Sequence, residues 1–280
     1  MKDFKVLAVG DMHVGSFYGL APPTFHVEDE VRQEALWFEA NRSQRRLYEY
    51  WKTMCEALEK ENLDAVIVNG DICEGQQYKQ RGAGVWTTDI YQQADVAVGL
   101  LEMIPAETFY ITMGSGYHSR GAQGTPPIEK YIADRLRERG KKAYFASELL
   151  LDIGEKRFHI AHKVGVTGPT GYRTTAIAKE LLTLMMHDDE TQYGDVDVAL
   201  RSHAHYFVSI RMEGKTGAVI PGWKARDDFA MKIGGTWCPH IGYVMLRWDV
   251  GNQVEVEETL FPSPAPACTV LRHGEVVEID

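Results

Sequence analysis

Short apolar runs that end in polar residues recur along this chain, and they constrain its fold more than any other feature. Residues 5–9 are KVLAV and lead into Asp11 and His13. Residues 65–68 are AVIV and lead into Asp71. Runs of this length, bounded by Gly or Asp, are typical of buried strands. We therefore expect sheets whose strands deliver polar side chains into the loops that follow them.

Helical periodicity separates these runs in the first half of the chain. Apolar residues recur at helical spacing over about 34–61 and again over 89–103. The segment 126–139 begins with proline and is followed by Gly140, which is the usual punctuation of a helix. Residues 20–33 contain two prolines and mixed polar residues, and we expect an irregular loop there. The first half therefore predicts the order βαβαβα.

After residue 143 short alternating segments dominate, and a single helix is expected at about 174–187. This combination predicts an α/β fold with layers in the order α/β/α or α/β/β/α. Polar residues that can bind metal follow strand-like runs in both halves, so we expect one domain over 1–280. Within it, residues 215–280 are expected to form a β-rich extension of the same domain.

Composition excludes several classes of protein. The net charge of −10 argues against a general basic surface for nucleic acid, although a local basic patch remains compatible with it. No apolar run approaches the roughly 18 residues of a membrane span, so we expect no membrane partner. The four cysteines form no C-x-x-C pair, which favours free thiols and a cytoplasmic location. The oligomeric state leaves no trace in the sequence.

The later strand-like runs also end in residues that can bind metal. These are Ser115 and His118 after 108–112, His162 at the end of 158–162, and His203 and His205 after 198–201. Loops at the carboxyl ends of parallel strands gather at one edge of a sheet, so segments far apart in sequence can form one site. Imidazole and carboxylate together suit Mn, Fe, Zn, Ni or Co. A shared carboxylate can hold two such ions about 3.5–4 Å apart.

In order and spacing, these residues resemble the motifs of the calcineurin-like metallophosphoesterases, which are D-x-H, G-D-x-x-[DE], G-N-H-[DE], an isolated H and G-H-x-H. The matching residues, which span 11–205, are Asp11-Met12-His13, Gly70-Asp71 with Glu74, His162 and Ser202-His203-Ala204-His205. Of the two layer orders, the resemblance implies the α/β/β/α sandwich with two central mixed sheets. It also implies a metal-dependent phosphoric ester hydrolase with two divalent ions, Mn first, with Fe, Zn, Ni or Co as alternatives. It implies that Asp11, His13 and His205 hold one ion, that His162 and His203 hold the other, and that Asp71 bridges them. It also implies that a hydroxide between the ions attacks phosphorus in line.

The third motif departs from the family pattern, and two alignments are open. If Gly114 is the motif glycine, Ser115 takes the place of the Asn ligand, and the histidine slips to His118. If Gly116 is the motif glycine, Tyr117 takes that place. We prefer the first alignment, because a small hydroxyl fits beside a metal more easily than a phenol. It also resembles a G-[ST]-x-x-H variant of phage-borne members.

Both alignments make His118 the candidate general acid for the leaving oxygen. The acid that normally follows this histidine in the family is Ser119 here, which is a second departure from the family pattern. Glu74 is expected to hydrogen-bond a ligand histidine. Strand alternation places His159 and His162 on opposite faces. We choose His162 as the ligand and expect His159 to be half-exposed.

Basic and aromatic residues in the loops suggest contacts to a nucleic acid, and we expect Tyr117, Arg120, Trp223 and Lys224 to bind substrate. Solvated loop charges and packed aromatic rings explain the same pattern equally well. The expected function is a phosphodiesterase or nuclease acting on DNA, encoded by a phage or prophage. A phosphomonoesterase or a small-molecule or cyclic-nucleotide phosphodiesterase is the alternative, and a non-catalytic scaffold ranks last.

Overall fold

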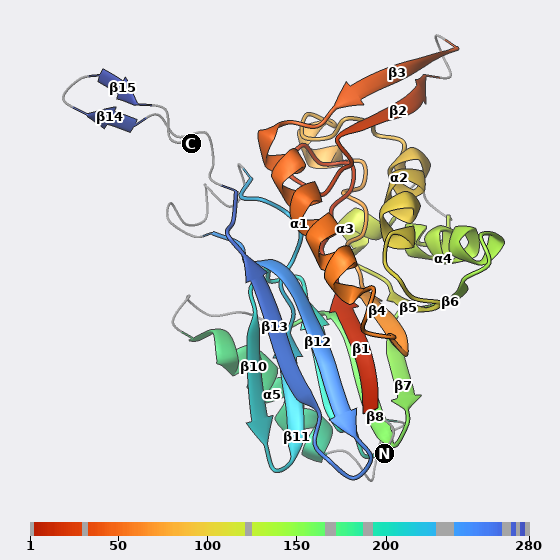
Figure 1. Ribbon diagram of the computed structural model, residues 1–280, viewed down its shortest axis with the longest axis vertical. Helices are drawn as coiled ribbons and strands as arrows, with labels where there is room; N and C mark the ends of the chain where they lie inside the picture. The colour runs from red at the N-terminus through yellow and green to blue at the C-terminus, as the bar shows by residue number, and fades with distance from the viewer. Residues whose placement is uncertain are drawn as a thin grey trace.

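The computed structural model describes residues 3–29, 33–120, 125–165, 172–186, 193–227, 238–264, 270–272 and 275–277. Two stacked β-sheets form its centre, and helices cover their outer faces (Figure 1). Among the described residues, no helix is both long enough and apolar enough to cross a membrane.

The first sheet is mixed. Its six strands lie in the order β13 (Glu255–Phe261), β12 (Ile241–Asp249), β1 (Asp3–Val9), β4 (Ala65–Asn69), β5 (Thr108–Thr112) and β6 (Lys142–Ala146). From β1 to β6 the strands run parallel, whereas β12 pairs antiparallel with both β1 and β13. The carboxyl ends of β1, β4 and β5 therefore meet at one edge of this sheet.

The second sheet is also mixed. Its five strands lie in the order β10 (Val208–Met212), β11 (Lys215–Val219), β9 (Val198–Ser202), β8 (Lys156–Lys163) and β7 (Leu149–Ile153). Strand β9 runs parallel to both β8 and β11, and the two edge strands are antiparallel to their neighbours. Strands β8 and β9 consequently deliver their last residues to the same end of the sheet.

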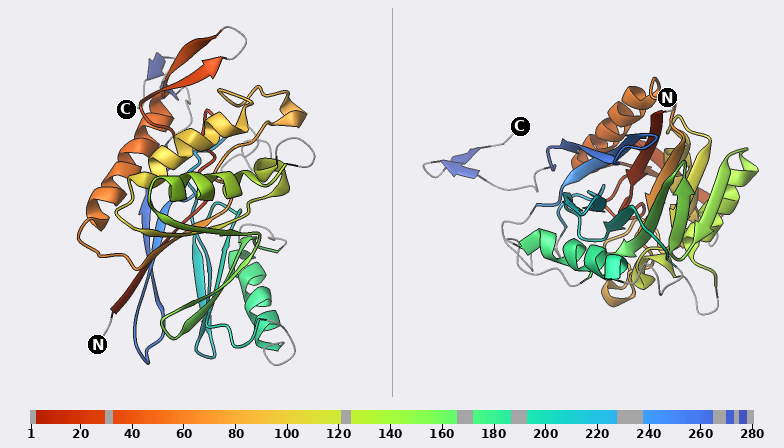
Figure 2. Two further views of the ribbon diagram at one scale, coloured as in Figure 1. Left: turned by 90° about the vertical axis from the view of Figure 1, so that its right-hand side faces the viewer. Right: turned by 90° about the horizontal axis from the view of Figure 1, so that it is seen from below.

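Helices cover both outer faces of the sheet pair, as the two views in Figure 2 show. Helices α1 (Arg42–Leu58), α2 (Ile90–Glu102) and α4 (Ile128–Glu138) pack on the first sheet, and α5 (Arg173–Met186) packs on the second. Along β1, Leu7 and Val9 face the helices, whereas Val6 and Ala8 face the second sheet. This alternation buries both faces of the strand. The predicted α/β/β/α sandwich with two mixed sheets is confirmed.

A β-hairpin replaces the loop that we expected over 20–33. Its strands are β2 (Thr24–Asp29) and β3 (Glu34–Glu39), and α1 begins only at Arg42, so the expected start of that helix near 34 is also wrong. Leu36 and Phe38 are half-buried while Trp37 between them is 73% exposed, which is strand alternation rather than helical spacing.

Asn41 starts helix α1 with a capping box. The Asn41 side chain accepts a hydrogen bond from the backbone N–H of Gln44, and the Gln44 side chain accepts one from the backbone N–H of Asn41. The apolar residues of 36–38 therefore belong to the hairpin, although they extend the apparent helical period. The remaining elements are η1 (Tyr78–Gln80), the one-turn helix α3 (Gly116–Ser119), β14 (Val270–Arg272) and β15 (Glu275–Val277).

The last third of the chain contributes strands to both sheets. Strand β11 lies inside the second sheet, and β12 and β13 complete the first sheet beside β1. Residues 228–237 and parts of 265–280 lie outside the described residues. That residues 1–280 form one domain stays a prediction.

Candidate metal centre

Five of the predicted ligands lie in turns that follow β1, β4 and β9, and their backbone is in the left-handed conformation. Ten non-glycine residues among those described have a positive φ, and five of them are predicted ligands: Asp11 (49°), His13 (47°), Asp71 (46°), His203 (71°) and His205 (50°). Such conformations cost free energy in non-glycine residues and cluster at functional sites. The backbone is therefore strained at the points where the sequence predicts a metal site.

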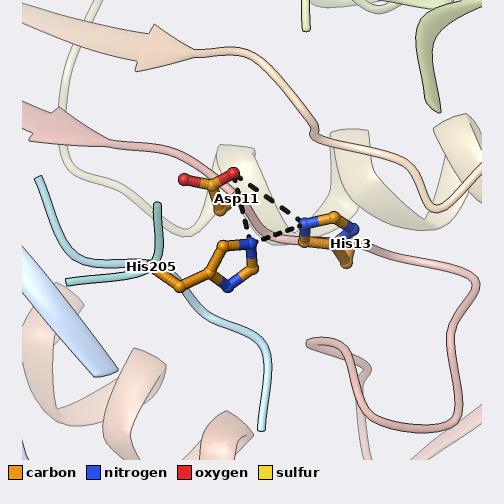
Figure 3. A group of neighbouring side chains, drawn as sticks. All are labelled: Asp11, His13 and His205. Carbon is orange, nitrogen blue, oxygen red and sulfur yellow. Dashed lines mark hydrogen bonds and ion pairs between the residues drawn. The ribbon is translucent and has the colours of Figure 1, made fainter. Parts of the chain in front are cut away.

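The first ligand group consists of Asp11, His13 and His205 (Figure 3). The Oδ1 atom of Asp11 lies 3.8 Å from Nε2 of His13 and 3.5 Å from Nε2 of His205, and the two nitrogens are 3.2 Å apart. Ligands bound to one tetrahedral ion at 2.0–2.1 Å are separated by about 3.3 Å. Oδ1 of Asp11 is buried and has no hydrogen-bond partner among the described residues. The group therefore fits a divalent cation.

The second ligand group consists of Asp71, His162 and His203. Oδ2 of Asp71 lies 3.0 Å from Nε2 of His162 and 3.8 Å from Nδ1 of His203, and these two nitrogens are 3.3 Å apart. Nε2 of His162 also lies 3.9 Å from Oδ1 of Asp11, which belongs to the first group. The two groups thus adjoin, and each has the donor atoms that borderline divalent metals prefer.

Hydrogen bonds fix which nitrogen of two histidines faces the centre. Nδ1 of His13 lies 2.7 Å from Oε2 of Glu74, and Nδ1 of His162 lies 2.8 Å from the carbonyl oxygen of Asn69. Both partners accept, so Nδ1 carries a proton in each ring and Nε2 is the nitrogen that faces the other ligands. The expected hydrogen bond from Glu74 to a ligand histidine is confirmed.

Burial and neighbouring charges shift the pKa values of these groups. Burial, helped by the Lys224 ammonium, lowers the pKa of His13 to about 4, so its imidazole is neutral at pH 7. Burial raises the pKa of Asp11 to about 6, although the positive charge on His162 opposes the shift.

In the second ligand group, burial would raise the pKa of Asp71 as well, but the facing His162 holds it well below its usual value. Burial would lower the pKa of His162, but the Asp71 carboxylate raises it to about 9. A cation held by His162 would therefore have to displace a proton.

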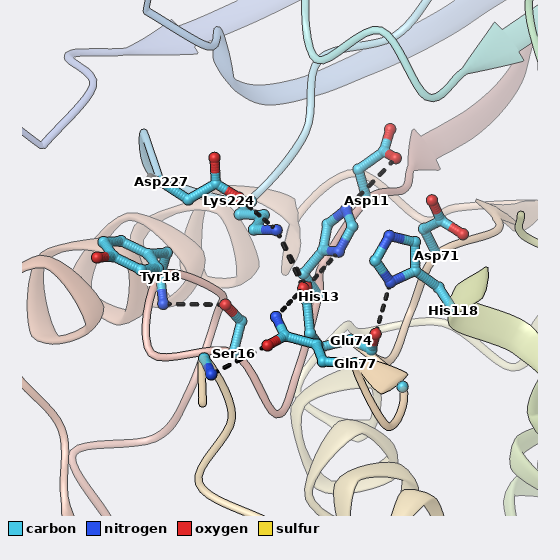
Figure 4. A network of polar contacts seen from close by, with 12 residues as sticks. Asp11, His13, Ser16, Tyr18, Asp71, Glu74, Gln77, His118, Lys224 and Asp227 are labelled. Carbon is cyan, nitrogen blue, oxygen red and sulfur yellow. Dashed lines mark hydrogen bonds and ion pairs between the residues drawn. The ribbon is translucent and has the colours of Figure 1, made fainter. Parts of the chain in front are cut away.

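Lys224 lies beside His13 and contacts Glu74, the acid that binds the His13 ring (Figure 4). Its ammonium lies 3.1 Å from Oε2 of Glu74 and 2.9 Å from Oδ2 of Asp227, and the side chain is buried. Gln77 donates a hydrogen bond to the other oxygen of Glu74. Our expectation that Lys224 contacts substrate is corrected, because its ammonium is engaged with these two carboxylates.

Trp223 does not line a substrate surface either. Its side chain has no exposed area and packs edge-on against Trp51, with ring centroids 4.8 Å apart. Trp223 is therefore a core residue between α1 and β13, whose Phe261 ring lies 6.0 Å away between centroids. Arg120 and Tyr117 lie on the surface beside the third motif, where Arg120 is exposed and Tyr117 half-buried. Their contact with substrate stays a prediction.

The third-motif loop contacts the second ligand group through Ser115. The Ser115 backbone N–H donates to Oδ1 of Asp71 at 2.6 Å, and its hydroxyl donates to Oδ2 at 3.3 Å. The Tyr117 ring instead packs edge-on against His118, with centroids 5.0 Å apart. This placement favours the alignment in which Ser115 takes the place of the Asn ligand. Its role as a ligand stays a prediction.

His118 lies beside the first ligand group. Its ring is perpendicular to that of His13 with centroids 4.6 Å apart, and its Nδ1 lies 2.5 Å from the carbonyl oxygen of Glu74. A carbonyl only accepts, so Nδ1 carries the proton, and Nε2 is the nitrogen that can exchange a proton with a substrate. Ser119 donates a hydrogen bond to Glu129, an acid 10 residues further along the chain.

His159 is buried, and our expectation that it is half-exposed is wrong. Its Nε2 bonds to Glu148, and its Nδ1 accepts a hydrogen bond from Arg201 at 2.9 Å. Arg201 also pairs with Glu180 of α5. The network therefore pairs the buried Arg201 guanidinium with an acid. Neither Lys224 nor Glu129 stands in a motif, so no spacing in the sequence indicates that they contact Glu74 and the third-motif loop.

Replacing Glu74 with glutamine should weaken metal binding. A neutral amide accepts the His13 N–H less strongly and removes one of the two carboxylate partners of Lys224, so we expect affinity for Mn²⁺ to fall about 10- to 100-fold. Isothermal titration of metal-stripped protein measures this. The exposed Glu59→Gln on the end of α1 is the control. An unchanged affinity in Glu74→Gln would show that this hydrogen bond does not support the centre.

No family model and no curated protein sequence matches the chain. Among solved structures it is similar to an archaeal phosphodiesterase, with a TM-score of 0.47, 12% identity and coverage of 92% of this chain and 100% of that chain. It is also similar to Vps29 of Entamoeba histolytica complexed with Zn²⁺ (TM-score 0.43, 14% identity, 92% and 100% covered). A predicted phosphoesterase of Streptococcus pneumoniae is similar too (0.39, 10%, 93% and 99%). At these scores and identities, a functional assignment depends on the geometry of the site.

Proposed function

We propose that this chain is a two-metal phosphodiesterase of the calcineurin-like metallophosphoesterase type. The observation that carries the proposal is the meeting of two ligand groups around Oδ1 of Asp11, a buried carboxylate oxygen without a hydrogen-bond donor among the described residues. An orphaned buried oxygen of this kind is costly unless a cation satisfies it. We propose Mn²⁺ as the ion at both groups, with Asp71 shared between them.

Two divalent cations supply Lewis-acid activation of water and of the phosphoryl group when bound. The protein orients the ligands: Glu74 and the Asn69 carbonyl hold the Nε2 atoms of His13 and His162 toward the centre. His118 donates a proton from Nε2 to the leaving oxygen, because its Nδ1 is already engaged with a carbonyl. The half-buried position of His118 beside His13 leaves it accessible to a substrate phosphate.

We propose nucleic acid, DNA in particular, as the substrate. The loop 75–88 carries Lys79 and Arg81 and contains no acid before Asp89, and exposed Tyr78 offers a ring for base stacking. This loop contacts the third motif, since a side chain on Gly75 would meet the backbone of Tyr117 and His118 at 3.0–3.1 Å. Local positive charge beside His118 can therefore offset the net charge of −10 where a phosphate would bind.

One set of assays tests the proposed function. Protein loaded with Mn²⁺ is incubated with single-stranded DNA, duplex DNA, bis-p-nitrophenyl phosphate and p-nitrophenyl phosphate, with chelator-treated protein as the control. We expect hydrolysis of DNA and of the diester, with the monoester at least about tenfold slower. Cleavage of the monoester alone would reject the nuclease. Absence of any cleavage, with two ions per chain confirmed by elemental analysis, would support the scaffold instead.

A further inference from the structure

A buried acid that the proposed chemistry does not use lies behind the third-motif loop. Glu129 is in the first turn of α4 and has no exposed surface. Its Oε1 accepts hydrogen bonds from the Gly114 backbone N–H at 3.0 Å and from the Ser119 hydroxyl at 2.6 Å. Its Oε2 has no partner among the described residues. Burial raises the pKa of Glu129 to about 7, which agrees with a carboxyl group that no cation neutralises.

The two hydrogen bonds of Glu129 reach the two ends of one short turn. The backbone N–H groups of His118 and Ser119 both donate to the carbonyl oxygen of Ser115, which closes the turn between Gly114 and Ser119. Helix α3 is only four residues long, so its own hydrogen bonds cannot fix its orientation. Oε1 of Glu129 therefore joins the start and the end of this turn to the rigid helix α4.

His118 is carried by this turn and is held at a second point by the Glu74 carbonyl. The direction of its Nε2 depends on both attachments, because the imidazole ring rotates about its side-chain bonds when the backbone turn moves. A general acid must lie within hydrogen-bond reach of the oxygen that it protonates. A small displacement at the Ser119 end of the turn is therefore sufficient to weaken the proton donation, while the aspartate and histidine ligands of the two groups, which lie on other segments, keep their places.

We propose that Glu129 is a positioning residue that holds His118 in place for proton donation, acting through Gly114 and Ser119. The inference rests on the proposed function, in which His118 protonates the leaving oxygen. Glu129 itself does not touch the substrate. Its role requires an acceptor oxygen at this position and requires no negative charge.

Leaving-group dependence tests the proposal. The substrates are the p-nitrophenyl and phenyl esters of thymidine 5′-phosphate, because phenol is the poorer leaving group and needs protonation more. We expect Ser119→Ala and Glu129→Ala to lower kcat for the phenyl ester about tenfold and kcat for the p-nitrophenyl ester less than about twofold. Glu129→Gln keeps the acceptor oxygen and should leave both values within about twofold of the wild type. KM and metal content should not change in any of the three.

Matched variants separate positioning from general damage. Glu138→Gln lies on the exposed side of the same helix, and Ser209→Ala lies on β10, so neither should alter either ester. If Glu129→Ala does not fold, Ser119→Ala still removes one of the two bonds without opening a large cavity. Equal loss on both esters in Ser119→Ala, or no loss on either, would overturn the proposal.

His118→Ala distinguishes a failure of the positioning role of Glu129 from a failure of the proposed general acid. A selective loss on the phenyl ester in His118→Ala, without one in Ser119→Ala, would reject only the positioning role of Glu129. No selective loss in His118→Ala itself would reject the general acid of the proposed function. Metal content by elemental analysis and the thermal midpoint of unfolding are measured for each variant, and unchanged values support a positional effect.

Discussion

Asp71→Ala should release both metal ions and lower kcat/KM for a diester by about 1000-fold or more. The side chain is buried and its Oδ2 lies 3.0 Å from Nε2 of His162 and 3.8 Å from Nδ1 of His203. Asp71 is the one carboxylate of the second ligand group, whose other two members are histidines. Its Oδ1 accepts the Ser115 N–H, so the substitution also frees the third-motif loop.

Metal content and activity are measured together for this variant. Asp71→Asn is the isosteric companion: it keeps the shape and the Ser115 hydrogen bond but removes the charge, and it should lose both ions as well. Asp134→Asn is the matched control: this half-buried acid of α4 pairs with Lys130 and Arg137, and the variant should retain two ions and full activity. Turnover of Asp71→Ala above about a tenth of wild type would reject its bridging role.

The convergence of the candidate ligands could be predicted from the sequence because most of them lie just after a strand and His162 lies within one. Strand periodicity identified β1, β4 and β9, and the residues that follow each strand supplied Asp11, Asp71 and His203. Parallel strands bring their carboxyl ends together, so the convergence of these residues followed from topology. For these residues, the pattern that predicts the strand also predicts where the residue after it lies in the fold.

The supporting residues could not be predicted, because they belong to no local pattern. Lys224 meets Glu74 across 150 positions of sequence, and Glu129 meets the third motif from a helix whose amphipathic period gives it only a buried position. A buried acid on a helix is not distinguished by spacing from an apolar residue. The hairpin β2–β3 was missed for a different reason: its alternating residues run directly into the period of α1.

We expect a second large effect at Gly114, because this glycine packs directly against Asp71. A Cβ atom on Gly114 would overlap with the Oδ1 and backbone N atoms of Asp71, which are fixed by burial and by the hydrogen bond from Ser115. The backbone N–H of Gly114 is also bound to Glu129, so the loop cannot move away without breaking that bond. We therefore expect Gly114→Ala to displace the third-motif loop from the metal centre.

Gly114→Ala should lower kcat/KM by about 100-fold or more and should reduce the free energy of unfolding by about 1–3 kcal/mol. Gly116→Ala is a close control, because a Cβ atom there meets nothing within 4 Å and the residue lies only two positions further along the same turn. It should leave activity and metal content unchanged, and the helical backbone of α3 should tolerate alanine. Urea unfolding, elemental analysis and diester hydrolysis measure the three quantities for both variants. Equal behaviour of the two alanine variants would mean that the contact between Gly114 and Asp71 does not hold the loop against the metal centre.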